Sequence, residues 1–161
     1  MNKAHALEQI IIALERDLAA LQAAVKVAHE SATHGESVAE NKYDTRGLEA
    51  AYLAHGQAKR AEEIDASLQV YEDVSKQTLV HSYHEAGISC LVQLEDQDGL
   101  TRWLWVGEEA GGLQFEFDDK ACTIITPKSP LGAALIGRQL GDIFELRVGD
   151  NLLEYEVISL D

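Results

Sequence analysis

The first third of the chain carries a regular stripe of apolar side chains. Steps of four and three residues alternate along it without a break, through Leu7, Ile11, Leu14, Leu18, Leu21, Val25, Ala28 and Ala32. This heptad spacing places the stripe on one face of a helix, and most residues between are good helix formers. We therefore expect a helix over about residues 3–33, roughly 45 Å long, with one face that must be buried.

A second helical run extends from about residue 43 to residue 73. Its stripe comprises Ala54, Ala61, Ile64, Leu68 and Tyr71, extended toward the first run by Leu48, Ala51 and Tyr52. The run contains no proline, although Gly47 and Gly56 each weaken a helix by about 1 kcal/mol relative to alanine. Because a short connection makes neighbouring helices antiparallel, residues 1–74 are predicted to form an antiparallel α-helical coiled-coil hairpin.

Beyond about residue 75 the apolar period changes to two, which is typical of strands. Strands are expected within residues 81–96, 100–107, 113–119, 121–127, 143–148 and 151–160. A short helix is expected within residues 129–142, because Ser129 suits an N-cap, Pro130 the first helical position and Gly137 the end. Residues 75–161 therefore predict an antiparallel β-sheet domain with one short helix, and the whole chain an α+β fold of two domains.

The composition is that of a soluble globular protein, with 46% apolar and 25% charged residues among 161. No apolar run approaches the roughly 20 residues that span a bilayer, and the first residues lack the apolar segment of a signal peptide, so we expect a cytoplasmic protein. Cys90 and Cys122 lie in separate strand-like contexts, which favours buried, reduced thiols. His81 and His84 have a metal-like spacing, but nothing near them in sequence completes a zinc site.

The formal net charge is −15, with 28 acidic and 13 basic residues. Binding to nucleic-acid phosphates needs clustered Lys and Arg, and the basic residues here are dispersed along the chain. We therefore expect no direct binding to duplex DNA. Any action near nucleic acid should pass through a protein partner, for which a basic surface would suit this charge.

Three carboxylates, Glu36, Glu40 and Asp44, recur at intervals of four residues between the two predicted helices. One interpretation is a solvated turn, since acidic side chains stabilise the N-terminus of the helix that follows. The other is that this tip, residues 34–44, is the working end of the molecule. The residues alone leave both interpretations open.

Two stretches resemble the bacterial Gre family of transcript cleavage factors, which includes GreA and GreB. Residues Ser129–Gly137 (SPLGAALIG), followed by Gly141 and Asp142, are similar to the signature helix and turn of the family's C-terminal domain. At the tip, His34-Gly35-Glu36 and Glu40-Asn41-Lys42-Tyr43 are similar to the family's acidic motif. The order of a hairpin followed by a sheet domain extends the resemblance over essentially the whole chain.

The resemblance implies a fold and a mode of action. The C-terminal domain would be FKBP-like, without prolyl isomerase activity, and would dock on a β′ coiled coil at the rim of the RNA polymerase secondary channel. We assign the docking to Pro127, Lys128, Ser129 and Pro130. The hairpin would enter the channel as a monomer and act only indirectly on the 3′ end of the nascent RNA.

In the family, the tip carboxylates help to hold the second Mg²⁺ of the polymerase active centre and its attacking water. Glu36, Glu40 and Asp44 would have this role here, sharing a metal that the free protein does not bind. One or two added carboxylates suit Mg²⁺, which takes oxygen ligands and keeps several waters. The protein would then not be an enzyme itself, but would stimulate the polymerase to cleave backtracked RNA.

The tip departs from the family pattern in its spacing. Glu36 stands where the family has Asp, and the pair Glu40-Asn41 comes one residue late. One residue rotates a helical side chain by about 100°, whereas metal coordination tolerates only a few tenths of an ångström, and Lys42 adds a positive charge. An alternative to cleavage is therefore a channel binder that inhibits or modulates the polymerase. A further alternative is a coiled-coil interaction module unrelated to transcription, which would dimerise through its hairpin.

Overall fold

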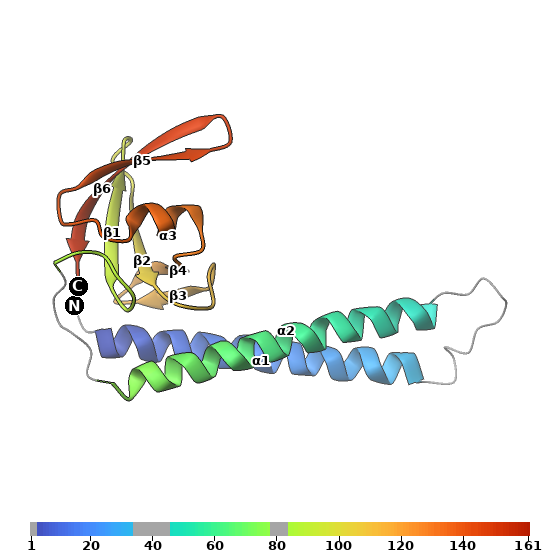
Figure 1. Cartoon of the computed structure of the whole chain (residues 1–161). Coiled ribbons are helices and arrows are strands. Elements are labelled where there is room, and N and C mark those ends of the chain that lie inside the picture. The colour runs from blue at the N-terminus through green and yellow to red at the C-terminus, as the bar shows by residue number, and fades with distance from the viewer. Residues whose placement is uncertain (1–2, 34–45, 78–83) are drawn as a thin grey trace. The chain divides into compact units, whose positions relative to one another are not determined.

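We analysed a computed structural model of the chain, which describes residues 3–33, 46–77 and 84–161. Two long helices, α1 (Lys3–Thr33) and α2 (Arg46–Ser75), precede the sheet strands (Figure 1). The strands and the third helix are β1 (Leu91–Asp96), β2 (Thr101–Val106), β3 (Gln114–Phe117), β4 (Lys120–Ile125), α3 (Pro130–Leu135), β5 (Ile143–Val148) and β6 (Asn151–Leu160). The predicted helix pair followed by a sheet with one short helix is confirmed.

The strand predicted within residues 81–96 begins only at Leu91. Residues 84–90 form bends and turns, in which the Cys90 amide donates to the Gly87 carbonyl at 3.2 Å. Ser89 has a positive φ of 64°, a conformation that an extended strand does not contain. Within the described residues 84–96, the strand therefore covers only Leu91–Asp96.

The chain divides into two compact units. The hairpin unit contains residues 14–69, and the sheet unit contains residues 1–13 and 70–161. The first turns of α1 and the last turns of α2 thus belong with the sheet, whereas the predicted domain boundary lies between residues 74 and 75.

Within the hairpin unit many described members of the two predicted stripes are at least half-buried. Their buried or half-buried members are Leu14, Leu18, Leu21 and Val25 of α1 and Ala54, Ala61, Ile64 and Leu68 of α2. The predicted extension of the second stripe is wrong, because Leu48 and Tyr52 are 57% and 71% exposed and Ala51 is exposed as well. Stepping back from Ala54 by four and then three residues gives positions 50 and 47 as the continuation of the stripe. Leu48 and Tyr52 are offset from these positions and therefore lie beside the stripe.

Gly56 lies in the middle of α2, and a methyl group added there would meet nothing within 4 Å. We expect Gly56→Ala to raise the free energy of unfolding by about 0.5–1 kcal/mol, because alanine loses less backbone entropy in a helix. Chemical denaturation followed by circular dichroism measures this difference. A loss of stability would mean that Gly56 is needed for a close approach to another segment.

The six strands form one sheet in the order β3-β4-β2-β1-β6-β5. All neighbouring pairs are antiparallel except β2 and β4, which run parallel from Trp103↔Cys122 to Val106↔Ile125. The expectation of an antiparallel sheet therefore needs correction at this pair. The physical reason is that β4 turns back from β3, through Asp118 and Asp119 at positive φ, and inserts between β3 and β2.

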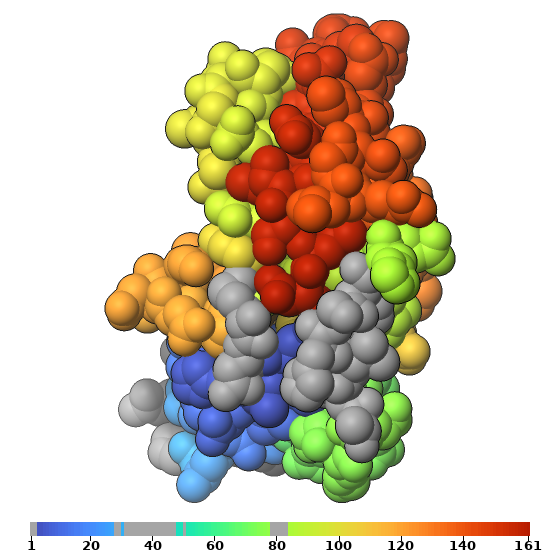
Figure 2. All heavy atoms as spheres, turned by 90° about the vertical axis from the view of Figure 1, so that its left-hand side faces the viewer, coloured from blue at the N-terminus to red at the C-terminus, as the bar shows by residue number. Residues whose placement is uncertain are grey.

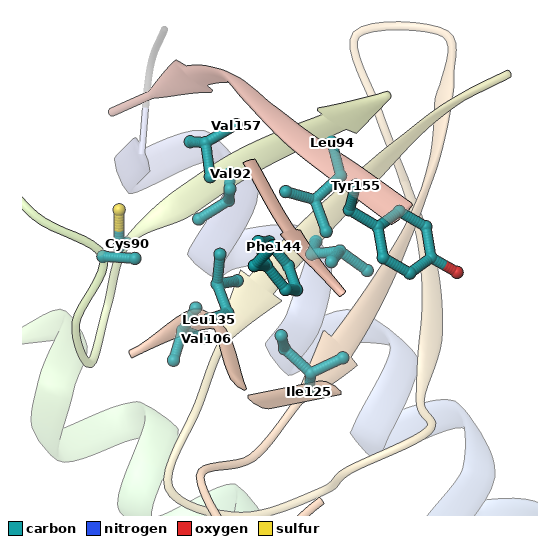
Figure 3. Close-up of a cluster of buried hydrophobic side chains, with 11 residues drawn as sticks. Cys90, Val92, Leu94, Val106, Ile125, Leu135, Phe144, Tyr155 and Val157 are labelled. Atoms are coloured by element: carbon teal, nitrogen blue, oxygen red, sulfur yellow. The ribbon is translucent and has the colours of Figure 1, made fainter. Parts of the chain in front are cut away.

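One face of the sheet packs against α3. The buried side chains on this face include Val92, Leu94, Leu104, Val106, Phe144, Tyr155 and Val157 from the strands and Leu135 from α3. Figure 3 shows Phe144 at the centre of this cluster, with Leu135 and Val106 beside it. Because α3 contributes a fully buried side chain, its position on the sheet is determined by packing as well as by its cap.

The opposite face of the sheet is covered by the ends of the long helices. Its buried strand residues are Leu91, Trp105, Phe115, Phe117, Cys122 and Ile124, and the helices add Ala6, Leu7, Ile10 and Tyr71. The rings of His5 and Phe117 have centroids 5.8 Å apart, which places the first turns of α1 over this face. In Figure 2 these first turns (blue) lie below the end of β6 (red).

Candidate functional site

The predicted working residues of the tip, Glu36, Glu40 and Asp44, lie outside the described residues, as does Tyr43. The predicted docking segment, Pro127–Pro130, lies between β4 and α3 in the sheet unit and is described in full. The candidate site is therefore the surface around this segment, which we call the docking loop.

The docking loop is a tight turn held by the carbonyl oxygen of Thr126. The backbone N–H and the hydroxyl of Ser129 both donate to this oxygen, at 2.9 and 2.8 Å. The Ser129 hydroxyl oxygen in turn accepts from the Gly132 amide at 3.1 Å, which caps α3. The helix ends at the Ile136 cap, followed by Gly137 at φ +80°, so its predicted start and end are both confirmed.

Gly132 is buried where α3 passes closest to the docking loop. An ideal Cβ at this position would collide with the carbonyl oxygen and carbon of Thr126 and would lie 3.0 Å from the Ser129 hydroxyl. Contacts this short with backbone atoms are not available to real side chains. The glycine is therefore required for the close packing of helix on loop that presents Ser129 and Pro130.

A hollow of about 570 Å³ lies beside the docking loop. Its lining is mostly apolar and comes from four segments: Gly111 and Gly112, Ile124–Thr126, Lys128–Leu131, and Leu146 with Val148 of β5. Three of the four predicted docking residues line it, and the fourth, Pro127, is exposed outside the lining. An open apolar surface of this kind suits protruding side chains of a protein partner.

The loop between β2 and β3, residues 107–113, forms one wall of the hollow. The Gly107 amide donates to the Ile125 carbonyl and the Gly112 amide to the Ile124 carbonyl, both at 2.8 Å. Sequence reasoning missed this loop as part of a site. The available signal was the pair Gly111-Gly112 between two predicted strands, since Gly112 adopts φ +90°, which favours glycine.

Lys128 of the docking loop pairs with Glu109 of the same β2–β3 loop. The distance from Lys128 Nζ to Glu109 Oε1 is 3.4 Å, and the two side chains are 80% and 50% exposed. A pair this exposed contributes well under about 1 kcal/mol to stability. The Lys128 ammonium group therefore stays accessible to an acidic group on a partner.

Tyr71 of α2 contacts the other side of the β2–β3 loop. Its hydroxyl donates to the Glu109 carbonyl at 2.9 Å, and its side chain fills the space above Gly107. Burial, together with the Glu109 and Glu108 carboxylates, raises the pKa of Tyr71 well above its ordinary value. The hydroxyl therefore stays protonated and remains a hydrogen-bond donor.

The cysteines agree with the prediction of buried thiols. Cys90 and Cys122 are free and buried, and burial raises the pKa of both thiols, that of Cys122 to about 11.

His81 lies outside the described residues, and His84 is exposed. Within residues 3–33, 46–77 and 84–161, no group of three or more His, Cys, Asp or Glu side chains could hold a metal ion. In the same ranges no helix is both long and apolar enough for a membrane span.

Comparison with known proteins connects this site to a family. Residues 112–161, which include most of the hollow's lining and all of the docking loop, match the family model for the C-terminal domain of the transcription elongation factors GreA/GreB. The chain is 26% identical to the transcription inhibitor protein Gfh1 of two Thermus thermophilus strains, over 95% of this chain and 91% of each relative. These descriptions name transcription factors and not enzymes, as the sequence resemblance implied.

Two solved structures are similar over nearly the whole chain. A structure of the transcription factor Gfh1 is 25% identical over 97% of this chain and 93% of its own, with a TM-score of 0.40. Another, of GreA factor homolog 1 (Gfh1) from Thermus thermophilus, is 27% identical over 96% and 94%, with a TM-score of 0.38. The matched C-terminal segment and the Gfh1 relatives together show that the chain is similar to the Gre-type transcription factors.

Proposed function

We propose that this protein binds RNA polymerase at its secondary channel and inhibits transcription, instead of stimulating RNA cleavage. The observation that carries this proposal is the preformed docking loop and apolar hollow, which lie mostly within the segment matched to the GreA/GreB C-terminal domain. Inhibition is favoured over cleavage because the relatives that align with 95% of the chain are named as transcription inhibitors. A factor bound to bacterial polymerase would act in the cytoplasm.

In this proposal the hollow receives side chains from the β′ coiled coil at the rim of the channel. Apolar side chains of the partner would pack on Leu131, Leu146 and Val148, which line the hollow. Lys128 would face an acidic group of the partner, since its own pair with Glu109 is weak and exposed.

The tip supports inhibition through its altered spacing. Glu40 comes one residue later than in the cleavage factors and Lys42 brings a positive charge, which together disfavour a carboxylate bound to the polymerase Mg²⁺. Glu36, Glu40 and Asp44 would then occupy the channel without completing the metal site. Cleavage stimulation stays a second candidate, because the total spacing from Gly35 to Tyr43 matches the cleavage motif.

We expect the purified protein to lower the yield of full-length RNA from bacterial RNA polymerase, and a charge in the hollow to prevent this. Val148→Glu places a carboxylate in the apolar lining, so polymerase affinity should fall at least tenfold through lost apolar contact. The matched control is Leu152→Glu, a similarly exposed apolar residue on β6 that does not line the hollow. Affinity is measured by fluorescence anisotropy of labelled protein. Equal losses in both variants would place the docking surface elsewhere.

A backtracked elongation complex with Mg²⁺ separates the two functions. Short 3′ RNA fragments that disappear with Glu36→Ala, Glu40→Ala or Asp44→Ala would establish cleavage and overturn inhibition. Binding without fragments would support inhibition. Mass in solution tests the remaining alternative, because a stable dimer that forms through the hairpin would block channel entry and favour an interaction module unrelated to transcription.

A further inference from the structure

The β2–β3 loop has two sides, and each side has a different contact. On one side, Gly111 and Gly112 form a wall of the hollow, and the Glu109 carboxylate pairs with Lys128 of the docking loop. On the other side, the Glu109 carbonyl accepts the Tyr71 hydroxyl, and Gly107 lies against the same side chain. Seven residues thus connect a partner-binding surface to the last turns of α2.

The β2–β3 loop is also held against neighbouring segments, so it cannot move independently of them. It is attached to the end of β4 by the two hydrogen bonds from Gly107 and Gly112. Gly111 contacts the Thr126 side chain, where an added Cβ would meet Cγ2 at 3.1 Å, and Thr126 begins the docking turn. If a bound partner displaces the hollow wall, the Glu109 carbonyl would therefore move relative to Tyr71.

We infer that the β2–β3 loop couples occupancy of the hollow to the packing of Tyr71, with Glu109 as the positioning residue that joins the two contacts. This inference rests on the proposed function, because it takes the polymerase as the occupant. Coupling between two contacts is reciprocal. If the hydrogen bond between Tyr71 and Glu109 favours the conformation of the hollow wall that binds the partner, then a bound partner strengthens that hydrogen bond by the same factor. Tyr71 itself is 2% exposed and does not line the hollow, so it cannot act by touching the partner.

The test compares the full-length wild type with Tyr71→Phe, which removes only the hydroxyl. We expect polymerase affinity to fall about fivefold, which corresponds to the loss of about one neutral hydrogen bond. Hydrogen exchange in the free protein should quicken at the Gly107 and Gly112 amides. Exchange at the Asp161 amide, which donates to Leu91 at 2.9 Å elsewhere in the sheet unit, should stay as in the wild type.

The matched control is Ile10→Val, which trims a fully buried side chain of α1 and lowers stability by an amount comparable to Tyr71→Phe. Its polymerase affinity should stay within twofold of the wild type. Equal affinities for the wild type and Tyr71→Phe, or equal losses in Tyr71→Phe and Ile10→Val, would overturn the coupling alone. A wild type that does not bind polymerase would overturn the proposed function and the coupling with it.

Discussion

Replacing Gly132 with alanine should displace α3 from the docking loop and reduce polymerase binding more than tenfold. The added Cβ would collide with the Thr126 carbonyl oxygen, which also accepts both donors of Ser129. Backbone shifts forced by an oversized side chain cost about 1–3 kcal/mol, and here they would disturb the turn that presents Lys128 and Pro130. Chemical denaturation and polymerase affinity measure the two effects separately.

Gly87→Ala is the matched control, because it lies in the same unit, has no positive φ and has open space around its Cβ direction. Its stability and its polymerase affinity should both stay close to those of the wild type. If Gly132→Ala unfolded at the same denaturant concentration as Gly87→Ala, the close packing between α3 and the docking loop would not be essential.

Leu7→Ala is expected to lower the free energy of unfolding by about 3 kcal/mol, since large-to-small changes at buried leucines cost about 2–5 kcal/mol. Leu7 is 1% exposed and belongs to the first turns of α1, which are part of the sheet unit. Loss of its side chain leaves a cavity at the face that carries Trp105 and Phe117. Urea denaturation followed by tryptophan fluorescence measures the change, because Trp105 is buried on that face.

Ile12→Ala serves as the comparison on the same helix. Ile12 is 49% exposed, so its truncation removes little buried area and should cost under about 1 kcal/mol. Comparable losses in the two variants would mean that the first turns of α1 are stabilised by the helix itself and not by the sheet.

The elements predicted most accurately are those whose signals are local. The unbroken heptad stripe placed α1 at Lys3–Thr33, because alternate steps of three and four select one helical face without reference to distant residues. Ser129, Pro130 and Gly137 likewise marked both ends of the short helix, since caps act on the neighbouring backbone. The docking role of the loop before this helix came only from the resemblance to the Gre family, and it stays a prediction.

The parts that escaped prediction depend on contacts between distant segments. Periodicity showed that Leu7 and Tyr71 lie on buried stripes, but it could not show that both cover the sheet. The parallel pairing of β2 with β4 could not be predicted from either sequence segment. The apolar period of a strand is two whether its neighbour runs parallel or antiparallel. The hollow forms only where the fold brings Val148 of β5 close to Gly111, which the sequence pattern does not show. The tip acids lie outside the described residues.

Helices cover both faces of the sheet, and this arrangement also affects how the chain folds during synthesis. His5 packs on Phe117, and Val92 pairs with Leu160, so essential contacts join residues far apart in sequence. Such contacts must wait for the later segments to leave the ribosome, and a high contact order slows folding. The apolar surface of the first turns of α1 therefore remains open to water until β3 and β4 are made. We expect this surface to be the part of the nascent chain most in need of protection from aggregation.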